Sequence, residues 1–201
     1  MIAIIDYGAG NIKSLQFAFD KLDLETCVTS DKQVILASDA IILPGVGAFN
    51  DAMKALEAHD LLEVLKQEAL SGKPFLGICL GMQLLYDQSF EDGVWTGLGL
   101  LNGKIKRIPS SVKVPHMGWN TLTLHQQSPI LKNIKDQDYV YFVHSYFAAD
   151  WNEDALISSC FYGEKLPAIV QKNNVIGMQF HPEKSGEAGI QLLKNFGEMI
   201  S

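Results

Sequence analysis

Short, fully apolar runs alternate with helical patterns through the first half of this 201-residue chain. The runs at residues 2–5, 40–43 and 75–78 carry no charged side chain, and residues 26–29 are a further strand candidate. Between them, helical spacing places Leu15, Phe19 and Leu22 on one face, and further helices are expected at residues 50–58 and 61–70. Strands that alternate with helices in this way predict an α/β fold, with an open, mixed but mostly parallel sheet flanked by helices.

The second half of the chain is richer in strands. Strand-like segments occur at residues 104–108, 121–125, 139–147, 156–160, 168–171 and 175–180. A final helix is expected at residues 186–200. We expect the strands to be partly antiparallel additions to the same sheet. Because the chain has no repeat, low-complexity tract or obvious linker, it predicts one domain over residues 1–201.

Composition excludes several classes of protein. The net charge is −7 and no run of five basic residues occurs, which argues against binding to nucleic acid or to an anionic membrane surface. The three cysteines, Cys27, Cys79 and Cys160, are far apart and form no Cys-x-x-Cys pair, so neither a disulfide framework nor a zinc cage is expected. The apolar run at residues 2–5 ends at Asp6 and is too short for a signal peptide or a membrane span. These features predict a cytoplasmic protein with reduced thiols.

A cysteine lies at the turn between an apolar strand and an expected helix at residues 82–86. Gly77 and Gly81 flank Cys79 at minus two and plus two. A sharp strand-to-helix turn needs small neighbours of this kind, because its central residue adopts a strained backbone conformation. Such a turn raises a nucleophile above the sheet edge and places it at a helix N-terminus, which favours a thiolate and stabilises an oxyanion. A structural cysteine between two packing glycines is the alternative.

A thiol nucleophile requires a base, and the base requires a group that orients it. His181 follows the strand expected at residues 175–180 and precedes Pro182 and Glu183. In an extended segment, residues two positions apart point the same way, so Glu183 can hold the His181 imidazole while His181 takes the proton of Cys79. The alternative is an ordinary loop with a solvated glutamate.

Another glycine-rich turn follows the strand at residues 40–43. In an open parallel sheet, the carboxyl ends of the strands line one crevice. The backbone N–H groups of Gly45, Val46 and Gly47 are therefore candidates for an oxyanion hole, together with the N–H of Leu80.

Other motifs indicate no cofactor or metal. The turn at residues 8–11 lacks the third glycine of a dinucleotide fingerprint, since position 13 is Lys13, and there is no phosphate-binding Gly-Lys-Ser/Thr loop. The histidines His116, His125 and His144 have no metal-ligand spacing, and we interpret them as packing or surface residues.

Several segments together resemble the class I, or triad, glutamine amidotransferases. The resemblance rests on GICLGMQ at residues 77–83 and HPE at residues 181–183. Three more stretches, PGVGAF at 44–49, PHMGWN at 115–120 and YFVHSY at 141–146, resemble more narrowly the glutaminase subunits of imidazole glycerol phosphate synthases. The resemblance runs from residue 6 to residue 185, and only residues 88–94 and 158–161 depart from it.

The resemblance implies a flavodoxin-like fold and the hydrolysis of glutamine to glutamate and ammonia. It implies that Cys79 forms a γ-glutamyl thioester, that His181 is general base and then acid, and that Glu183 orients His181. It further implies that Gln83 helps to bind glutamine, and that Gly45 to Gly47 supply oxyanion or glutamine contacts. Candidates for the partner face and the ammonia passage are Asn11, Trp119, Tyr141 and Lys184.

The expected partner is a cyclase barrel subunit that forms a heterodimer with this chain and uses its ammonia in histidine biosynthesis. The motifs occupy the chain and leave no second domain, and no basic patch for a doubly phosphorylated substrate. Three alternatives remain open at this point: a glutaminase of another pathway, such as pyridoxal phosphate synthesis, a stand-alone cysteine hydrolase or peptidase, and a non-catalytic regulatory module.

Overall fold

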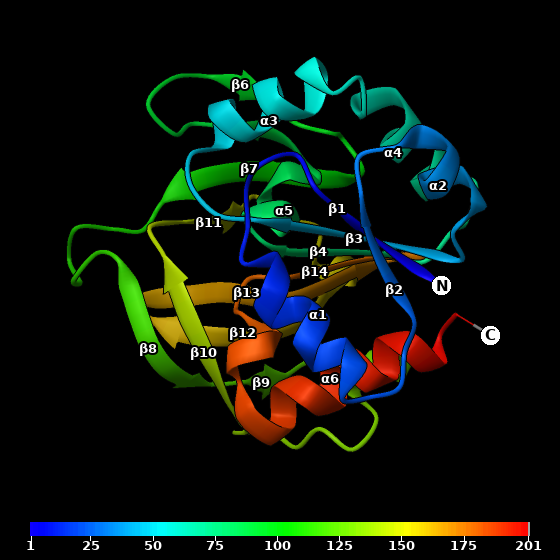
Figure 1. Ribbon diagram of the computed structural model, residues 1–201. Coiled ribbons are helices and arrows are strands. Elements are labelled where there is room, and N and C mark those ends of the chain that lie inside the picture. The colour runs from blue at the N-terminus through cyan, green and yellow to red at the C-terminus, as the bar shows by residue number, and fades with distance from the viewer. Residues whose placement is uncertain (201) are drawn as a thin grey trace.

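Five parallel strands form the larger part of the main sheet in the computed structural model, which describes residues 1–200 (Figure 1). Their order in the sheet is β2 (Thr26–Thr29), β1 (Ile2–Ile5), β3 (Ala40–Gly45), β4 (Phe75–Cys79) and β14 (Val175–Met178). The sheet continues antiparallel through β13 (Glu164–Lys172), β12 (Leu156–Tyr162) and β9 (Thr123–Leu124). The predicted mixed, mostly parallel sheet is confirmed.

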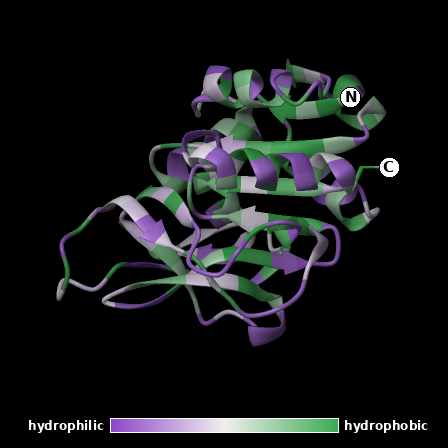
Figure 2. Cartoon of the chain, turned by 90° about the horizontal axis from the view of Figure 1, so that it is seen from below, coloured by the Kyte–Doolittle hydropathy of each residue, from purple (hydrophilic) through white to green (hydrophobic). Residues whose placement is uncertain are grey.

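The apolar strands alternate between two cores, one on each face of the sheet. Ile2 and Ile4 of β1 pack with the helices α1 (Ile12–Asp20) and α6 (Gly186–Glu198), whereas Ile5 packs on the opposite face. That face is covered by α3 (Phe49–Ala58) and α4 (Leu62–Leu70). Figure 2 shows the consequence: hydrophobic residues dominate the strands, and the outer sides of the helices are hydrophilic. Burial on both faces explains why these strands contain no charged residue.

Two expected strands of the second half do not join the main sheet. The segment expected at residues 104–108 is β7 (Leu101–Arg107), and residues 139–147 divide into β10 (Tyr139–His144) and β11 (Tyr146–Ala149). Strand β10 pairs with β8 (His116–Thr121) in a separate antiparallel ribbon. A third sheet has the order β11, β7, β5 (Tyr86–Ser89) and β6 (Trp95–Thr96). The expectation of one sheet was wrong here, because β7 and β10 bury alternate residues and thus suit sheets with one exposed face.

Helix boundaries also differ from expectation. The helix expected at residues 82–86 is α5 (Leu80–Leu84), which begins directly after Cys79. It ends early because the carbonyl of Leu85 accepts bonds from the N–H groups of Leu100 and Leu101, which leads the chain into β5. The short α2 (Lys32–Ala37) was not predicted, since one buried residue, Ile35, gives no periodic signal. No helix within residues 1–200 is both long and apolar enough to cross a bilayer.

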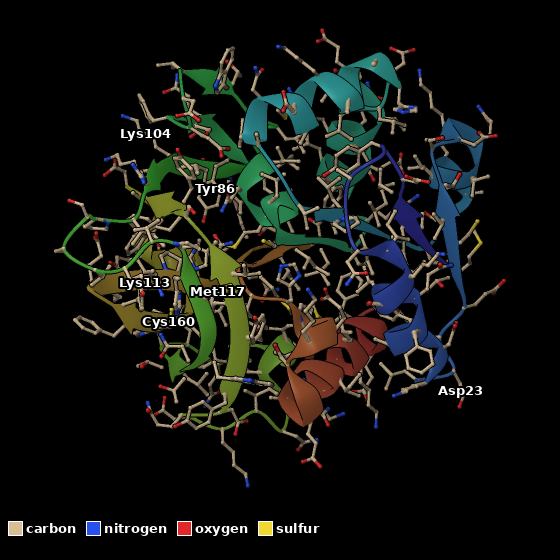
Figure 3. The ribbon with its side chains drawn as sticks, turned by 60° about the vertical axis from the view of Figure 1, so that its left-hand side comes forward. Asp23, Tyr86, Lys104, Lys113, Met117 and Cys160 are labelled. Carbon is tan, nitrogen blue, oxygen red and sulfur yellow. The ribbon has the colours of Figure 1, made fainter. Side chains whose placement is uncertain are left out.

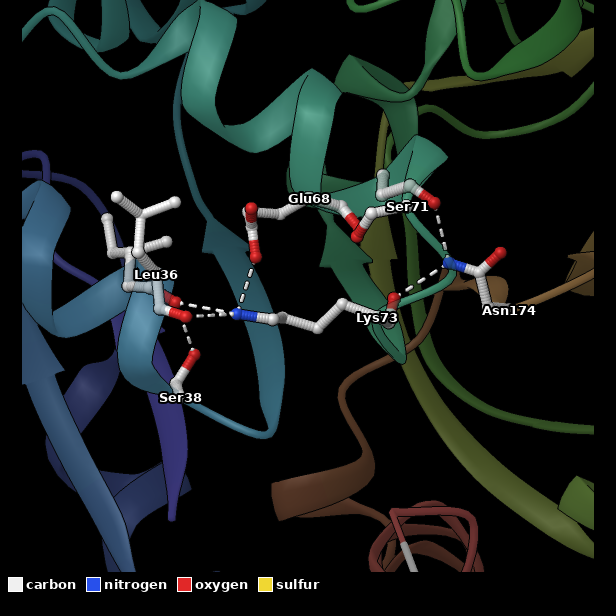
Figure 4. A network of polar contacts seen from close by, with 8 residues as sticks. Leu36, Ser38, Glu68, Ser71, Lys73 and Asn174 are labelled. Carbon is white, nitrogen blue, oxygen red and sulfur yellow. Dashed lines mark hydrogen bonds and ion pairs between the residues drawn. The ribbon is translucent and has the colours of Figure 1, made fainter.

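A closed polar cluster ties the elements together where β4 and β14 begin (Figure 4). The Lys73 ammonium donates to the carbonyls of Ile35 and Leu36, both at 2.9 Å, and pairs with the Glu68 carboxylate. The amide of Asn174 donates to the carbonyls of Ala69 and Lys73, both at 2.7 Å. This Lys73–Asn174 cluster joins α2, α4 and the starts of the two strands.

Candidate active site

The carboxyl ends of three neighbouring strands bring the predicted site residues together. Cys79 is the last residue of β4, and it pairs in register with Gly45 at the end of β3. On the other side of β4, Met178 of β14 pairs with Ile78, and His181 follows three residues later. Segments far apart in sequence therefore meet at one edge of the sheet, where ligands bind in open α/β folds.

Cys79 occupies a strained turn that depends on its two flanking glycines. Its backbone has φ +54° and ψ −112°, an uncommon conformation for a residue with a side chain. A Cβ on Gly77 would lie 2.7 Å from the carbonyl oxygen of Gly81, and a Cβ on Gly81 would lie 1.8 Å from the carbonyl oxygen of Leu43. The elbow predicted from the sequence is thus present, and no larger residue fits at either flank.

His181 stands between Cys79 and Glu183. Its Nδ1 donates to Glu183 Oε1 at 2.9 Å, and both side chains are almost fully buried. Cys79 and His181 line the same cavity, and Cys79 is near enough to affect the pKa of His181. Burial alone lowers the pKa of His181, but the interactions with Cys79 and Glu183 outweigh this effect and raise the pKa to about 9. An imidazole held by a carboxylate beside a cysteine is placed to exchange a proton with the thiol, as nucleophilic catalysis requires.

The local path from His181 to Glu183 differs from the expected one. Residues Pro182–Lys184 form a 3₁₀ turn, not an extended segment. The turn is closed by the N–H of Lys184, which donates to the carbonyl of His181 at 3.0 Å. Proline suits the first position of such a turn because it has no N–H to satisfy there. The 3₁₀ turn therefore brings the side chains of His181 and Glu183 together, where an extended segment was expected.

A cavity of about 370 Å³ opens beside Cys79 and His181. Besides Cys79 and His181, four predicted residues line it: Val46, Gly47, Leu80 and Gln83. Gly45 does not line this cavity; it packs beneath it, against the Tyr7 hydroxyl and the backbone of Gly81. A cavity of this size suits a small metabolite.

Several residues of the site were not predicted. Glu91 lines the cavity, and its Oε2 accepts a 2.7 Å bond from the N–H of Phe49 at the start of α3. Burial raises the pKa of Glu91. It lies in the segment of residues 88–94 that departed from the family pattern, so no motif marked it. Ser145 and Tyr146 also line the cavity, from the bend between β10 and β11.

Gln179 and Tyr7 contact the residues that form the site. Gln179 is fully buried, and its Nε2 lies 4.0 Å from the sulfur of Cys79. The sequence could have indicated Gln179, because it stands two residues before His181 and alternate residues of an extended segment point to the same side. The hydroxyl of Tyr7 donates to the carbonyl of Pro44 at 2.8 Å and so fixes the end of β3.

The four residues expected at the partner face surround the same edge. The rings of Trp119 and Tyr141 meet edge to face, with centroids 5.8 Å apart. Tyr141 also holds the histidine loop: its carbonyl accepts the N–H of His181 at 3.0 Å. Lys184 is exposed beside Glu183, and Asn11 is exposed at a small recess that His181 and Glu183 also line. Their roles at a partner face and in ammonia passage stay predictions.

Solved structures and a family model match the whole fold. The family model described as "Glutamine amidotransferase class-I" matches residues 3–199. A crystal structure of a glutamine amidotransferase superposes with a TM-score of 0.79 at 17% identity and covers 100% of this chain and 99% of that one. The structure of PurLQS from Thermotoga maritima gives a TM-score of 0.79 at 20% identity and covers 100% and 98%. At these identities the structures establish the fold.

Curated relatives are much closer in sequence. The imidazole glycerol phosphate synthase subunit HisH of Oceanobacillus iheyensis is 62% identical over 200 residues, covering 100% of both chains. The subunit of the same name from Caldanaerobacter subterraneus subsp. tengcongensis is 50% identical over 200 residues, covering 100% of this chain and 98% of its own. The resemblance inferred from the motifs is confirmed. The chain belongs to the class I glutamine amidotransferases and, within them, to the HisH subunits of imidazole glycerol phosphate synthase.

Proposed function

We propose that this protein hydrolyses L-glutamine through a thioester on Cys79 and delivers the ammonia to a cyclase subunit for histidine biosynthesis. The observation that carries the proposal is that Cys79 and His181 line one cavity of about 370 Å³, with Glu183 hydrogen-bonded to His181 Nδ1 at 2.9 Å. The names of the HisH relatives favour this pathway over pyridoxal phosphate synthesis. In this proposal residues 1–201 act as one glutamine amidotransferase domain in the cytoplasm, where the three free cysteines stay reduced.

The first half of the reaction forms the thioester. The thiolate of Cys79 attacks the side-chain carbonyl carbon of glutamine, and a carbon–sulfur bond forms. The backbone N–H groups of Leu80 and of the Val46–Gly47 segment are the donors for the oxygen that becomes negative. His181, held through Nδ1 by Glu183, gives the proton on its other nitrogen to the amide nitrogen. The carbon–nitrogen bond then breaks and ammonia leaves.

The second half regenerates the enzyme. Now neutral, His181 takes a proton from a water molecule, and the resulting hydroxide attacks the thioester carbon. The carbon–sulfur bond breaks, glutamate leaves, and the thiolate and imidazolium are restored. The carboxylate of Glu183 stabilises the imidazolium at the start and end of the cycle.

Polar residues around the cavity provide the contacts for substrate. Among the described residues that line it, Glu91 alone carries a carboxylate, which suits the α-ammonium group of glutamine. Gln83 is buried at the cavity wall and is held by the carbonyl of Tyr146 at 2.9 Å and by Gln179 at 3.0 Å. These positions support binding of an amino acid with its amide directed at Cys79.

The partner would cover the exposed aromatic edge around the site. Met117 and Trp119 of β8 and Tyr139 of β10 are 61%, 55% and 62% exposed, and Figure 3 shows Met117 on this outer ribbon. Exposed apolar clusters mark interaction surfaces. Ammonia in water near neutral pH is mostly protonated and unreactive, so delivery requires a dry passage. We therefore propose that a cyclase of (β/α) barrel fold docks here as a heterodimer.

Reconstitution with the cyclase subunit of the same organism tests the proposal. The Cys79→Ala variant is expected to lose glutamine-dependent synthesis by at least about 10³-fold while it keeps synthesis from added ammonium. Cys27→Ala, which removes a half-buried thiol remote from the cavity, is the matched control.

Three results would contradict the proposal. Glutamine-dependent synthesis that persists in Cys79→Ala would exclude this nucleophile. Full glutaminase turnover without any partner complex would favour the stand-alone hydrolase. Absence of glutamine turnover in the wild-type complex would favour a non-catalytic module.

A further inference from the structure

Two buried histidines face each other at the wall of the cavity, which His144 lines and His116 does not. His116 of β8 and His144 of β10 are direct partners across the ribbon, and they are 3% and 6% exposed. The distance from His116 Nδ1 to His144 Nε2 is 3.0 Å. The interpretation of these histidines as packing or surface residues does not account for this hydrogen bond.

Each hydrogen bond in this group has a direction set by its neighbours. The carbonyl oxygen of Tyr146 accepts at 2.8 Å from His144 Nδ1, so that nitrogen carries the hydrogen. In a neutral ring His144 Nε2 is then an acceptor, and His116 Nδ1 must donate to it. His116 Nε2 accepts in turn from the amide Nδ2 of Asn120 at 3.2 Å. The Asn120 amide is oriented by the carbonyl of Phe161, to which Nδ2 donates at 3.1 Å.

The environment keeps both rings neutral and fixed. Burial lowers the pKa of His116 to about 4 and that of His144 to about 3. The His116 ring is stacked between Phe142 and Tyr162, with centroid distances of 4.7 Å and 4.1 Å. The chain of donors therefore has one orientation near neutral pH.

The chain of donors ends on the substrate side at Tyr146. The Tyr146 carbonyl has two acceptor positions, and the second receives Gln83 Nε2 at 2.9 Å. Gln83 also donates to Gln179 Oε1 at 3.0 Å, and Gln179 Nε2 reaches the sulfur of Cys79 at 4.0 Å. The Tyr146 carbonyl thus joins the histidine pair to the two glutamines beside the nucleophile.

We propose that His116 and His144 are positioning residues that set the Tyr146 carbonyl and, through it, Gln83 and the wall formed by residues 143–146 for glutamine binding. His144 lines the cavity itself, but both of its nitrogens have protein partners, so its polar groups act on the site through Tyr146 and His116. The inference rests on the proposed glutaminase function. It assigns these residues to substrate binding and not to the chemical step.

Steady-state kinetics of the reconstituted complex test this assignment. His116→Phe keeps a ring in the stack and removes both hydrogen bonds; it is expected to raise KM for glutamine about tenfold with kcat within about threefold. His144→Leu is expected to raise KM by at least as much. In His144→Asn, the amide nitrogen replaces Nδ1 as donor to the Tyr146 carbonyl, so KM for glutamine is expected to return most of the way to the wild-type value. Synthesis from ammonium should be unchanged in all three, which also shows that they fold and dock.

A matched control separates positioning from general packing. Tyr162→Phe keeps the stack on His116 and removes the hydroxyl that bonds the carbonyl of Lys113 at 2.6 Å, so its KM should equal that of wild type. An unchanged KM in both His116→Phe and His144→Leu would overturn the inference. An equal rise of KM in Tyr162→Phe, or no rescue by His144→Asn, would also overturn it.

A further variant decides if these proteins do not fold. His116→Asn keeps a donor towards His144. A glutamine KM near that of wild type in His116→Asn supports the inference, and a tenfold rise overturns it. Inactive wild-type complex would instead refute the proposed function.

Discussion

The two ends of β4 and β14 differ in how their polar groups are satisfied. At the amino ends, Lys73 and Asn174 direct their donors to backbone carbonyls and to Glu68, within a closed cluster (Figure 4). At the carboxyl ends, Cys79 and His181 face a cavity. Cys79 has a strained backbone there, and Glu183 Oε2 is buried with no hydrogen-bond partner among the described residues.

The amino ends of the two strands contribute to stability, whereas their carboxyl ends provide the groups needed for activity. Satisfied polar groups at the amino ends lower the free energy of the folded state. Strain and incompletely paired groups at the carboxyl ends raise it, and such features persist at functional sites when the surrounding fold holds them. Substitutions at one end should therefore change stability, and those at the other should change turnover.

Among substitutions that keep the nucleophile, Glu183→Gln should have the largest effect on turnover. A neutral amide can accept the His181 bond but cannot stabilise the imidazolium, so kcat for glutamine should fall by about 10²-fold or more. The free energy of unfolding should not be reduced when it is measured above about pH 9, where protonated His181 no longer contributes stability. Single-turnover kinetics and denaturant unfolding measure the two quantities. Glu187→Gln, on the exposed first turn of α6, is the control. Unchanged kcat would remove Glu183 from the triad.

Lys73→Met should show the opposite behaviour. Loss of the ammonium leaves Glu68 and two carbonyls without their donor, and the free energy of unfolding should fall by about 3 kcal/mol. Turnover by the folded protein should equal that of wild type. The exposed Lys194→Met serves as control and should be neutral. A large drop in kcat for folded Lys73→Met would break the separation between the two ends.

Stability should depend on pH in opposite directions on the two sides of about pH 6.5. The raised pKa of His181 gives stability that is complete below its unfolded pKa of about 6.5 and is lost as pH rises through about 9. The lowered pKa values of His116 and His144 give stability that is present above about 6.5 and is lost as pH falls towards about 4 and 3.

Denaturant unfolding across this range measures both slopes. In His181→Gln the decline between about pH 6.5 and 9, on the order of 3 kcal/mol, should disappear. In His144→Asn the decline below about pH 6.5 should be shallower. Parallel pH curves for wild type and His181→Gln would show that His181 gains no protonated state on folding.

The sequence predicted the residues of the site better than the arrangement of the strands. The elbow at Cys79 and the His181–Glu183 pair follow from local spacing and strand ends, and both are present in the structure. The separate ribbon and third sheet were missed, because apolar runs alone do not show which sheet a strand joins. Glu91 and the His116–His144 bond were missed because each depends on segments that only the fold brings together.

Trapping of the intermediate tests the central claim most directly. The wild-type complex is quenched in acid during glutamine turnover, and the peptide that contains Cys79 is examined by mass spectrometry. A glutamyl group bound to Cys79, absent from the Cys79→Ala variant, is the predicted result. A glutamyl group on another residue, or glutamine turnover that continues in Cys79→Ala with no adduct, would contradict the account.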